Sequence, residues 1–328
     1  MSHQSETHAI IEPLLPLYFR DIYYGTKGLE GNRDNFSSGG VTSKPSSMFT
    51  PFKLTRHHSP QNTFLMHAVL LVASSHLQHL QPQEKEHQIV ALEHLSQALP
   101  MFRGALAATY HDQSRPTEAF IACSMLLLQY LWTFNSEWWQ SILGLYRGLT
   151  HIVLDFGDLS ERNPFSSMLI YSPRMRIEGY LKDKEVPSNL EEVFSHCLSC
   201  TQISGLLNGN YRDYAEPSQR LVTIMCALRL GSRHLEESGL VHDVARYLFS
   251  WPNLLPDRFV SFLKIGDRRA QVILLYYFVA VSRLRCERFW WMRDRAVYMF
   301  EAISFSLGER CTDCTGRATE MFEEEDLE

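Results

Sequence analysis

The sequence predicts an all-α fold, a single irregular domain of about ten helices. Apolar residues recur at helical spacing through most of the chain, and no segment alternates between apolar and polar residues for long. Prolines and glycines divide these segments at places typical of helix ends. No unit recurs at a fixed period, which argues against a solenoid of repeats. One irregular helical body is therefore expected.

The first group of predicted helices precedes a proline-containing stretch. It covers residues 13–24, 62–80, 83–110, 116–134 and 137–156. The helix at 62–80 is apolar nearly all round, which predicts a place in the middle of the structure. Pro100 falls inside the next helix and is expected to kink or divide it, because proline lacks a backbone N–H.

The second group follows residues 157–189, which carry three prolines and form the least helical region after the first loop. It covers residues 190–207, 217–230, 233–250, 257–263, 267–288 and 293–307. Trp251 and Pro252 break the chain within this group. Gly308 is predicted to end the last helix.

The two ends of the chain and one long loop are expected to lie outside the helical body. Residues 1–7 are predicted to be a disordered N-terminus, and residues 25–60, rich in Gly, Ser and Asn over their first half, a mobile loop. The helical domain would then span residues 8–310. Residues 311–328 are expected to form an acidic, solvated tail, because the chain closes on a run of acidic side chains.

Charge and composition exclude several classes of protein. The 328 residues carry a formal net charge of −6, so no general basic face is available for direct nucleic acid binding. No apolar run approaches the roughly 18 residues that a membrane span needs. The first residues are polar, and the seven cysteines are expected to be reduced. These features predict a protein of the nucleus or cytosol that is not secreted.

Sequence motifs of common enzymes are missing. The chain contains no P-loop, no G-x-G-x-x-G after a strand, no G-x-S-x-G and no H-E-x-x-H. An aspartate-rich helix that would collect magnesium ions is also missing, which argues against an ordinary terpene synthase. We therefore expect no cofactor.

Cysteines occur in two C-x2-C pairs, Cys197-Leu-Ser-Cys200 and Cys311-Thr-Asp-Cys314. Zinc ribbons space such pairs by about 15–20 residues, whereas about 110 residues intervene here. The pairs could still meet in space, but buried cysteines acting as small apolar residues are expected. No metal site is predicted.

Histidines cluster early in the chain. His76 and His79 lie about 60° apart on one helix, but no third ligand for a metal is apparent on that face. His67 is a lone polar group in an apolar helix and needs a hydrogen-bond partner. Two interpretations stay open for it: a core histidine with a protein partner, or a donor to a ligand hydroxyl.

Six tryptophans supply much of the aromatic mass. They indicate either core packing or an apolar pocket with a few polar tips, as in sites for sterol-like or terpenoid ligands. The candidate ligand-binding residues are His67, Tyr130, Trp132, Trp138, Trp139, Tyr146, Trp290, Trp291 and Arg293.

Three stretches carry a resemblance to a known family. They are the helix of residues 64–77 (FLMHAVLLVASSHL), the corner that begins Phe249-Ser-Trp-Pro252 and continues to Phe259, and the segment Phe289-Trp-Trp291. In order and spacing they resemble the fungal six-cysteine zinc-cluster transcription factors of the sterol-uptake-control type. The resemblance covers most of residues 8–308.

The resemblance implies the helical regulatory domain of that family without its DNA-binding part. A zinc cluster needs six cysteines within about 30–40 residues, and the first cysteine here is Cys123. The implied function is regulation of a fungal sterol or secondary-metabolite pathway, by sensing a lipophilic small molecule and acting with a protein partner such as a full-length transcription factor.

Two other interpretations stay open. The domain could be a repurposed cyclase or pericyclase that holds a terpenoid or polyketide in a reactive conformation. The chain could also be incomplete, with a cysteine-rich segment encoded upstream.

Overall fold

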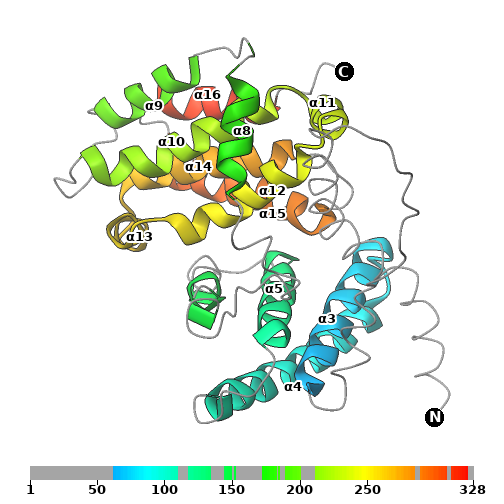
Figure 1. Cartoon of the computed structure of the whole chain (residues 1–328). Helices are drawn as coiled ribbons and strands as arrows, with labels where there is room; N and C mark the ends of the chain where they lie inside the picture. Colours follow the sequence, from blue (N-terminus) through cyan, green and yellow to red (C-terminus); the bar gives the residue numbers. More distant parts are fainter. Residues whose placement is uncertain are drawn as a thin grey trace, which may run out of the picture. The chain divides into compact units, whose positions relative to one another are not determined.

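The structure is a computed structural model that describes residues 62–109, 117–133, 144–149, 151–152, 172–182, 184, 189–200, 211–284, 289–308 and 312–323. Every regular element within these ranges is a helix and none is a strand, which confirms the all-α prediction (Figure 1). These ranges contain thirteen helices, compared with about ten expected for the chain. The predicted helix at 13–24, the N-terminus and the loop at 25–60 lie outside the described residues.

The chain divides into two compact units. Unit 1 comprises Met1–Leu131 and Arg147–Tyr171, and unit 2 comprises Trp132–Tyr146 and Ser172–Glu328. The boundary falls inside helix α5 (Thr117–Thr133), so that Tyr130 belongs to unit 1 and Trp132 to unit 2. The expectation of a single domain stays a prediction.

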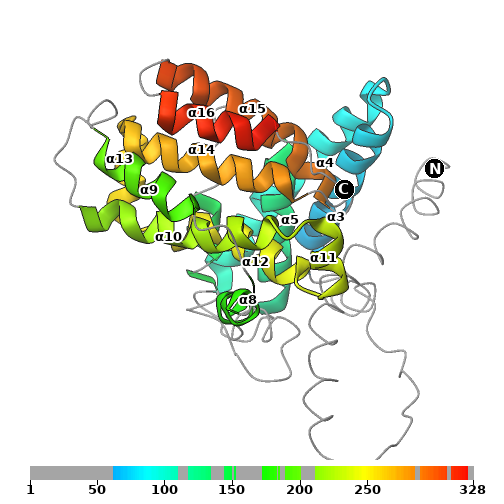
Figure 2. The ribbon, with the colours of Figure 1, turned by 90° about the horizontal axis from the view of Figure 1, so that it is seen from above.

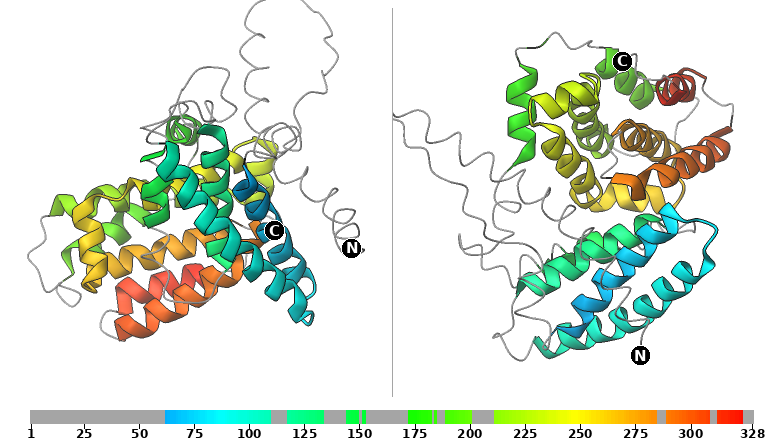
Figure 3. Two further views of the ribbon diagram at one scale, coloured as in Figure 1. Left: turned by 90° about the horizontal axis from the view of Figure 1, so that it is seen from below. Right: turned by 90° about the vertical axis from the view of Figure 1, so that its right-hand side faces the viewer.

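Unit 1 is built on two long helices that run side by side, α3 (Thr63–Leu80) and α4 (Lys85–Thr109) (Figure 3). Three buried phenylalanines join them to α5. Phe64 of α3 stacks on Phe120 of α5 with ring centroids 5.4 Å apart, and Phe102 of α4 lies 5.6 and 6.0 Å from these two rings. Helix α3 buries residues on most of its circumference, as its apolar sequence predicts.

Helix α4 continues through Pro100 instead of dividing there. A proline inside a helix removes one hydrogen bond to the carbonyl four residues earlier, here that of Ser96. Both Pro100 and Ser96 are exposed, so water can bind to this carbonyl. The exposed position explains why the helix tolerates the proline.

Unit 2 is organised around α14 (Arg268–Arg283), which has no polar face along most of its length. Every residue from 272 to 281 is buried, and helices α15 (Trp290–Leu307) and α16 (Thr312–Glu323) lie alongside it (Figure 2). The Asp267 carboxylate caps its first turn by accepting a hydrogen bond from the Ala270 N–H at 3.0 Å. No described helix, α14 included, is long and apolar enough to cross a membrane.

The remaining helices of unit 2 surround α10, which contacts α8, α9, α12, α13 and α14. Their bounds are α8 Pro173–Leu181, α9 Asn189–Ser199, α10 Tyr211–Leu228, α11 Ser232–Glu237, α12 Val241–Ser250, the 3₁₀ helix η2 Trp251–Leu254 and α13 Asp257–Lys264. Helix α8 lies in the stretch expected to be least helical. The helix expected at 233–250 is two helices, because Gly239 adopts a φ of +68° between them.

The end of the chain differs from the expected acidic tail. Gly308 ends α15 with a φ of +60°, as predicted, but residues 312–323 then form α16. Cys314, Ala318 and Met321 are buried, and the Phe322 ring stacks on the Phe300 ring of α15 with centroids 4.0 Å apart. A buried apolar face at a spacing of three to four residues holds this segment against the body of unit 2.

Candidate functional site

Aromatic side chains of unit 2 gather around Trp132. We call this group the Trp132 cluster, and it consists of Trp132, Phe249, Trp251, Tyr277, Phe278, Phe289 and Trp291. The Trp132 ring lies 6.0 Å from Trp291 in an edge-to-face arrangement and 6.3 Å from Tyr277. These geometries are the ones that aromatic quadrupoles favour.

Four segments distant in sequence contribute to the Trp132 cluster. The end of α5 supplies Trp132, α14 supplies Tyr277 and Phe278, and the start of α15 supplies Trp291. The Ser-Trp-Pro corner supplies Trp251, which is fully buried and stacks on Tyr277 with centroids 4.6 Å apart. The corner that carries the family resemblance is therefore part of the same core.

Several polar atoms in the Trp132 cluster have partners inside the protein. The Trp251 indole N–H donates to the Pro217 carbonyl at 3.0 Å, and the Trp132 indole acts to lower the pKa of the nearby Tyr146 phenol. Burial raises the pKa of Tyr146 and of Tyr277, so both phenols are neutral near pH 7. The cluster therefore carries hydroxyl groups but no negative charge from these two residues.

The indole N–H of Trp291 is a buried donor in the Trp132 cluster. Trp291 is buried, with 7% of the residue exposed, and its Nε1 atom has no hydrogen-bond acceptor among the residues that the structure describes. The surrounding groups are rings of Trp132, Phe249 and Phe289, whose edges offer no oxygen. A buried donor in this state can bind an oxygen atom of a ligand.

A second strong donor lies one helical turn further along α15. Arg295 is 1% exposed, and residues four apart on a helix are neighbours on one face, so its backbone position is beside that of Trp291. Burial lowers the pKa of the guanidinium to about 9, and the nearby Tyr298, whose ring centroid is 5.8 Å from Cζ, raises it. Arg295 is thus still a cation near pH 7.

The structure brings together three of the predicted site residues, Trp132, Tyr146 and Trp291. Trp290 is half-buried, and Arg293, one of the polar residues expected at a pocket, is exposed. Trp138 and Trp139 lie outside the described residues. Sequence reasoning missed Arg295, although its spacing of four from Trp291 could have identified it once the buried face of α15 was known.

The other two candidates, His67 and Tyr130, belong to unit 1. His67 is half-buried, and its Nδ1 atom lies 3.1 Å from Nδ1 of His94 on α4. His67 therefore has a protein partner, as one of the two open interpretations expects, but it is not a fully buried core histidine. Tyr130 is buried, and burial raises the pKa of its phenol to about 12.

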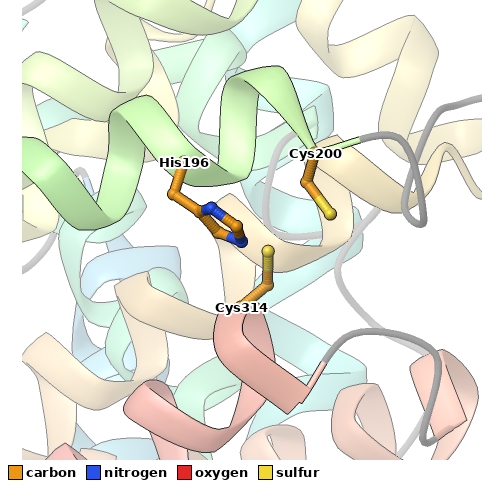
Figure 4. Close-up of side chains that lie close together, drawn as sticks. All are labelled: His196, Cys200 and Cys314. Atoms are coloured by element: carbon orange, nitrogen blue, oxygen red, sulfur yellow. The ribbon is translucent and has the colours of Figure 1, made fainter.

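Metal-ligating side chains gather at one place in the described residues of unit 2. His196, Cys200 and Cys314 each offer one ligand atom, and these atoms all lie within 4.8 Å of one another (Figure 4). One cysteine of each C-x2-C pair thus meets the other in space. Cys197 is buried but is not a member of this group, and Cys311 lies outside the described residues.

Comparison of the chain with known proteins finds no matching family model, no matching curated protein and no matching solved structure. The resemblance to fungal zinc-cluster transcription factors stays a prediction from the residues that carry it.

Proposed function

We propose that this chain is a ligand-sensing regulatory domain, similar to that of fungal zinc-cluster transcription factors, and that it binds a lipophilic small molecule at the Trp132 cluster. The molecule would have a flat apolar body of the sterol or terpenoid kind and at least one oxygen acceptor. The observation that carries this proposal is the buried Trp291 N–H, which has no acceptor in the part of the chain that the structure describes.

The energetic reason lies in the cost of an unsatisfied donor. A polar group that is buried without a partner costs about 1–3 kcal/mol relative to the same group in water. An oxygen atom of a bound ligand would recover this free energy, while its apolar body would gain from contact with the rings of Trp132 and Phe249. A hydrocarbon of the same shape would gain only the second contribution.

Arg295 refines the chemistry of the ligand. A carbonyl or carboxylate would accept from the guanidinium more strongly than an ether would, because charge-assisted hydrogen bonds are about twice as strong as neutral ones. Burial of Arg295 on the same face of α15 as Trp291 places two donors within one helical turn. We therefore favour a ligand with a carbonyl or carboxylate over one with a hydroxyl alone.

The regulatory half of the proposal is supported by the sequence resemblance. Trp251, the central residue of the resembling corner, packs directly on Tyr277 of the Trp132 cluster. In this proposal a ligand would bias the conformation of the cluster, and a protein partner such as a full-length transcription factor would detect the change in the nucleus or cytosol.

A matched pair of probes tests the binding half. We would titrate the purified chain with cholest-4-en-3-one and with its hydrocarbon counterpart cholestane, and follow tryptophan fluorescence and calorimetry. The ketone should bind about 5- to 100-fold more tightly, which corresponds to the 1–3 kcal/mol of the recovered donor. Trp291→Phe keeps an aromatic ring, removes the N–H and should abolish this preference.

Trp290→Phe is the matched control, because Trp290 is the half-buried neighbour on the same turn. It should keep the preference for the ketone. Equal binding of ketone and hydrocarbon by the unmodified chain, or a preference that survives Trp291→Phe, would contradict the proposal.

The regulatory half has its own test. A tagged chain should capture a zinc-cluster transcription factor from fungal extract, and the ketone should change the amount captured. If the ketone no longer changes the amount captured by the Trp291→Phe variant, ligand binding at Trp291 is coupled to binding of the transcription factor. Capture that is unchanged by the ketone in both proteins would contradict regulation by this ligand.

One observation favours a second candidate function, a cofactor-free cyclase or pericyclase. Two donors on one helix face, Trp291 and Arg295, could polarise a carbonyl and lower the barrier of a cyclisation in a substrate held in a reactive conformation. To test it, we would incubate the chain with linear polyene ketones and use liquid chromatography with mass spectrometry to look for a product of the same mass as the substrate. An identical rate with Arg295→Met would exclude this role.

A further inference from the structure

A group of three metal-ligating side chains connects α9 to α16, away from the residues of the Trp132 cluster. His196 lies in the last turn of α9, and Cys200 follows four residues later, so both project from the same side of the helix end. Cys314 lies in the first turn of α16. Figure 4 shows the imidazole and the two thiols pointing toward one another.

Three hydrogen bonds, one within the end of α9 and two from α14, hold the backbone that carries these ligands. The Cys200 N–H donates to the His196 carbonyl at 2.8 Å, which closes the end of α9. From α14, the Tyr276 hydroxyl donates to the Cys314 carbonyl at 3.1 Å and the Arg269 guanidinium donates to the Cys200 carbonyl at 3.4 Å. Tyr276 and Arg269 are seven residues apart and therefore share a face of α14.

These outer contacts resemble the supporting shell of a metal site, in which neighbouring groups orient the ligands. The Tyr276 ring also packs on the Phe194 ring of α9, with centroids 4.9 Å apart. Helices α9, α14 and α16 all contact one another. The two cysteines are therefore brought together by packed helices and not by a loop.

We propose that His196, Cys200 and Cys314 bind a zinc ion that ties the end of α9 to α16. One imidazole nitrogen and two thiolates are ligands that zinc favours, at about 2.0–2.3 Å. In a tetrahedron of such bonds two sulfurs lie about 3.8 Å apart. Ligand atoms already within 4.8 Å of one another need to close by only about 1 Å.

The surroundings of the group also fit a metal. Cys314 is fully buried and Cys200 nearly so, which keeps solvent from the thiolates, whereas 47% of the His196 side chain is exposed and leaves a route for the ion. The Asp313 carboxylate lies 4.0 Å from Nε2 of His196 and is the candidate fourth ligand, directly or through water. A disulfide between the two cysteines would have no use for the histidine or the carboxylate.

Cobalt and zinc titrations of the full chain test this site. The chain is reduced, stripped with a chelator and titrated with Co²⁺, which replaces zinc and reports its ligands by absorption. One equivalent should produce the charge-transfer band of thiolate–cobalt bonds and the visible bands of a tetrahedral ion. Zn²⁺ should then displace the cobalt stoichiometrically and raise the Tm.

Ligand variants locate the ion. Cys200→Ser and His196→Asn should each weaken zinc binding by about 100-fold or more, because loss of a ligand exceeds the 10- to 100-fold effect of losing a supporting group. His196 is exposed, so His196→Asn should fold normally by circular dichroism even if a buried cysteine variant does not. Cys197→Ser, a buried cysteine on the same helix, is the matched control and should bind zinc like the unmodified chain.

Three results would overturn the proposal. The first is cobalt binding without the thiolate band, and the second is equal zinc affinity in His196→Asn and the unmodified chain. The third is evidence for a disulfide between the two cysteines. In that case the chain purified without reductant would have a mass lower by two hydrogens, Cys200→Ser would abolish this mass difference, and the reduced chain would bind no zinc. None of these results bears on ligand binding at the Trp132 cluster.

Discussion

Replacing Trp251 with phenylalanine tests whether the Ser-Trp-Pro corner stabilises the core of unit 2. The indole is fully buried, donates a hydrogen bond to the Pro217 carbonyl at 3.0 Å, and stacks on Tyr277 at 4.6 Å and 17°. Trp251→Phe removes the hydrogen bond and keeps a smaller ring in the stack. We expect a loss of stability without a change of fold.

The magnitude follows from two contributions. A hydrogen bond contributes a net stabilisation of about 1 kcal/mol. The Pro217 carbonyl lies inside α10 and is also placed to accept a helical hydrogen bond, so its loss of the indole donor adds no further cost for an unsatisfied acceptor. Phenylalanine is smaller by roughly 40 Å³, and at about 24 cal/mol per Å³ the resulting cavity costs about 1 kcal/mol. The expected loss in the free energy of unfolding is therefore about 2 kcal/mol.

Urea unfolding followed by circular dichroism measures this loss. With a slope of about 2 kcal/mol per molar urea, the midpoint should fall by about 1 M while the slope stays the same. Trp290→Phe is the control at a half-buried tryptophan and should lower the midpoint by less than half as much. Equal shifts for the two variants, or no shift for Trp251→Phe, would refute the reasoning that the corner is a buried support.

Two further predictions concern titratable groups. Burial, reinforced by the charge of His67 and opposed by Glu93, lowers the pKa of His94 in the folded state, so the unfolded chain binds more protons below about pH 6.5 and stability is lost as the pH falls from there. His94→Gln should flatten this loss in urea midpoints measured between about pH 7.5 and 5, and an unchanged slope would contradict the assignment. Arg176→Met should cost about 3 kcal/mol in the free energy of unfolding, because it removes the Nη1 atom 2.7 Å from the nearly fully buried Asp243 carboxylate. Burial already raises the pKa of Asp243 and Arg176 opposes this, so the deficit should shrink as the pH falls, and adding Asp243→Asn should recover much of it. A deficit that is independent of pH and survives the second substitution would show that Arg176 acts through packing alone.

Local sequence patterns predicted the helices well where apolar spacing and helix ends agree. The predicted helix at 62–80 is α3 almost residue for residue, and Gly308 ends α15 as expected. The patterns failed where packing outweighs local preference. Pro100 lies inside α4 because the site is exposed, and residues 312–323 form α16 because three of their side chains are buried against unit 2.

The candidate site was predicted in part. Aromatic content pointed to Trp132 and Trp291, but helical periodicity alone could not assign Arg293 to solvent and Arg295 to the interior. Exposed apolar residues such as Phe305 and Tyr298 hide the buried face of α15, which becomes clear only when α14 is packed against it. The same holds for His94, which no local pattern connects to His67.

Two kinds of information are thus separate in this protein. The all-α class and the burial of α14 depend on hydrogen bonds within each helix and on the apolar run at 272–281, and both are local properties of the sequence. The meeting of Cys200 with Cys314, and the burial of the Trp291 N–H among rings from other segments, depend on contacts between residues far apart in the chain. Such contacts arise from the packing of whole helices, and the spacing of residues within one helix cannot encode them.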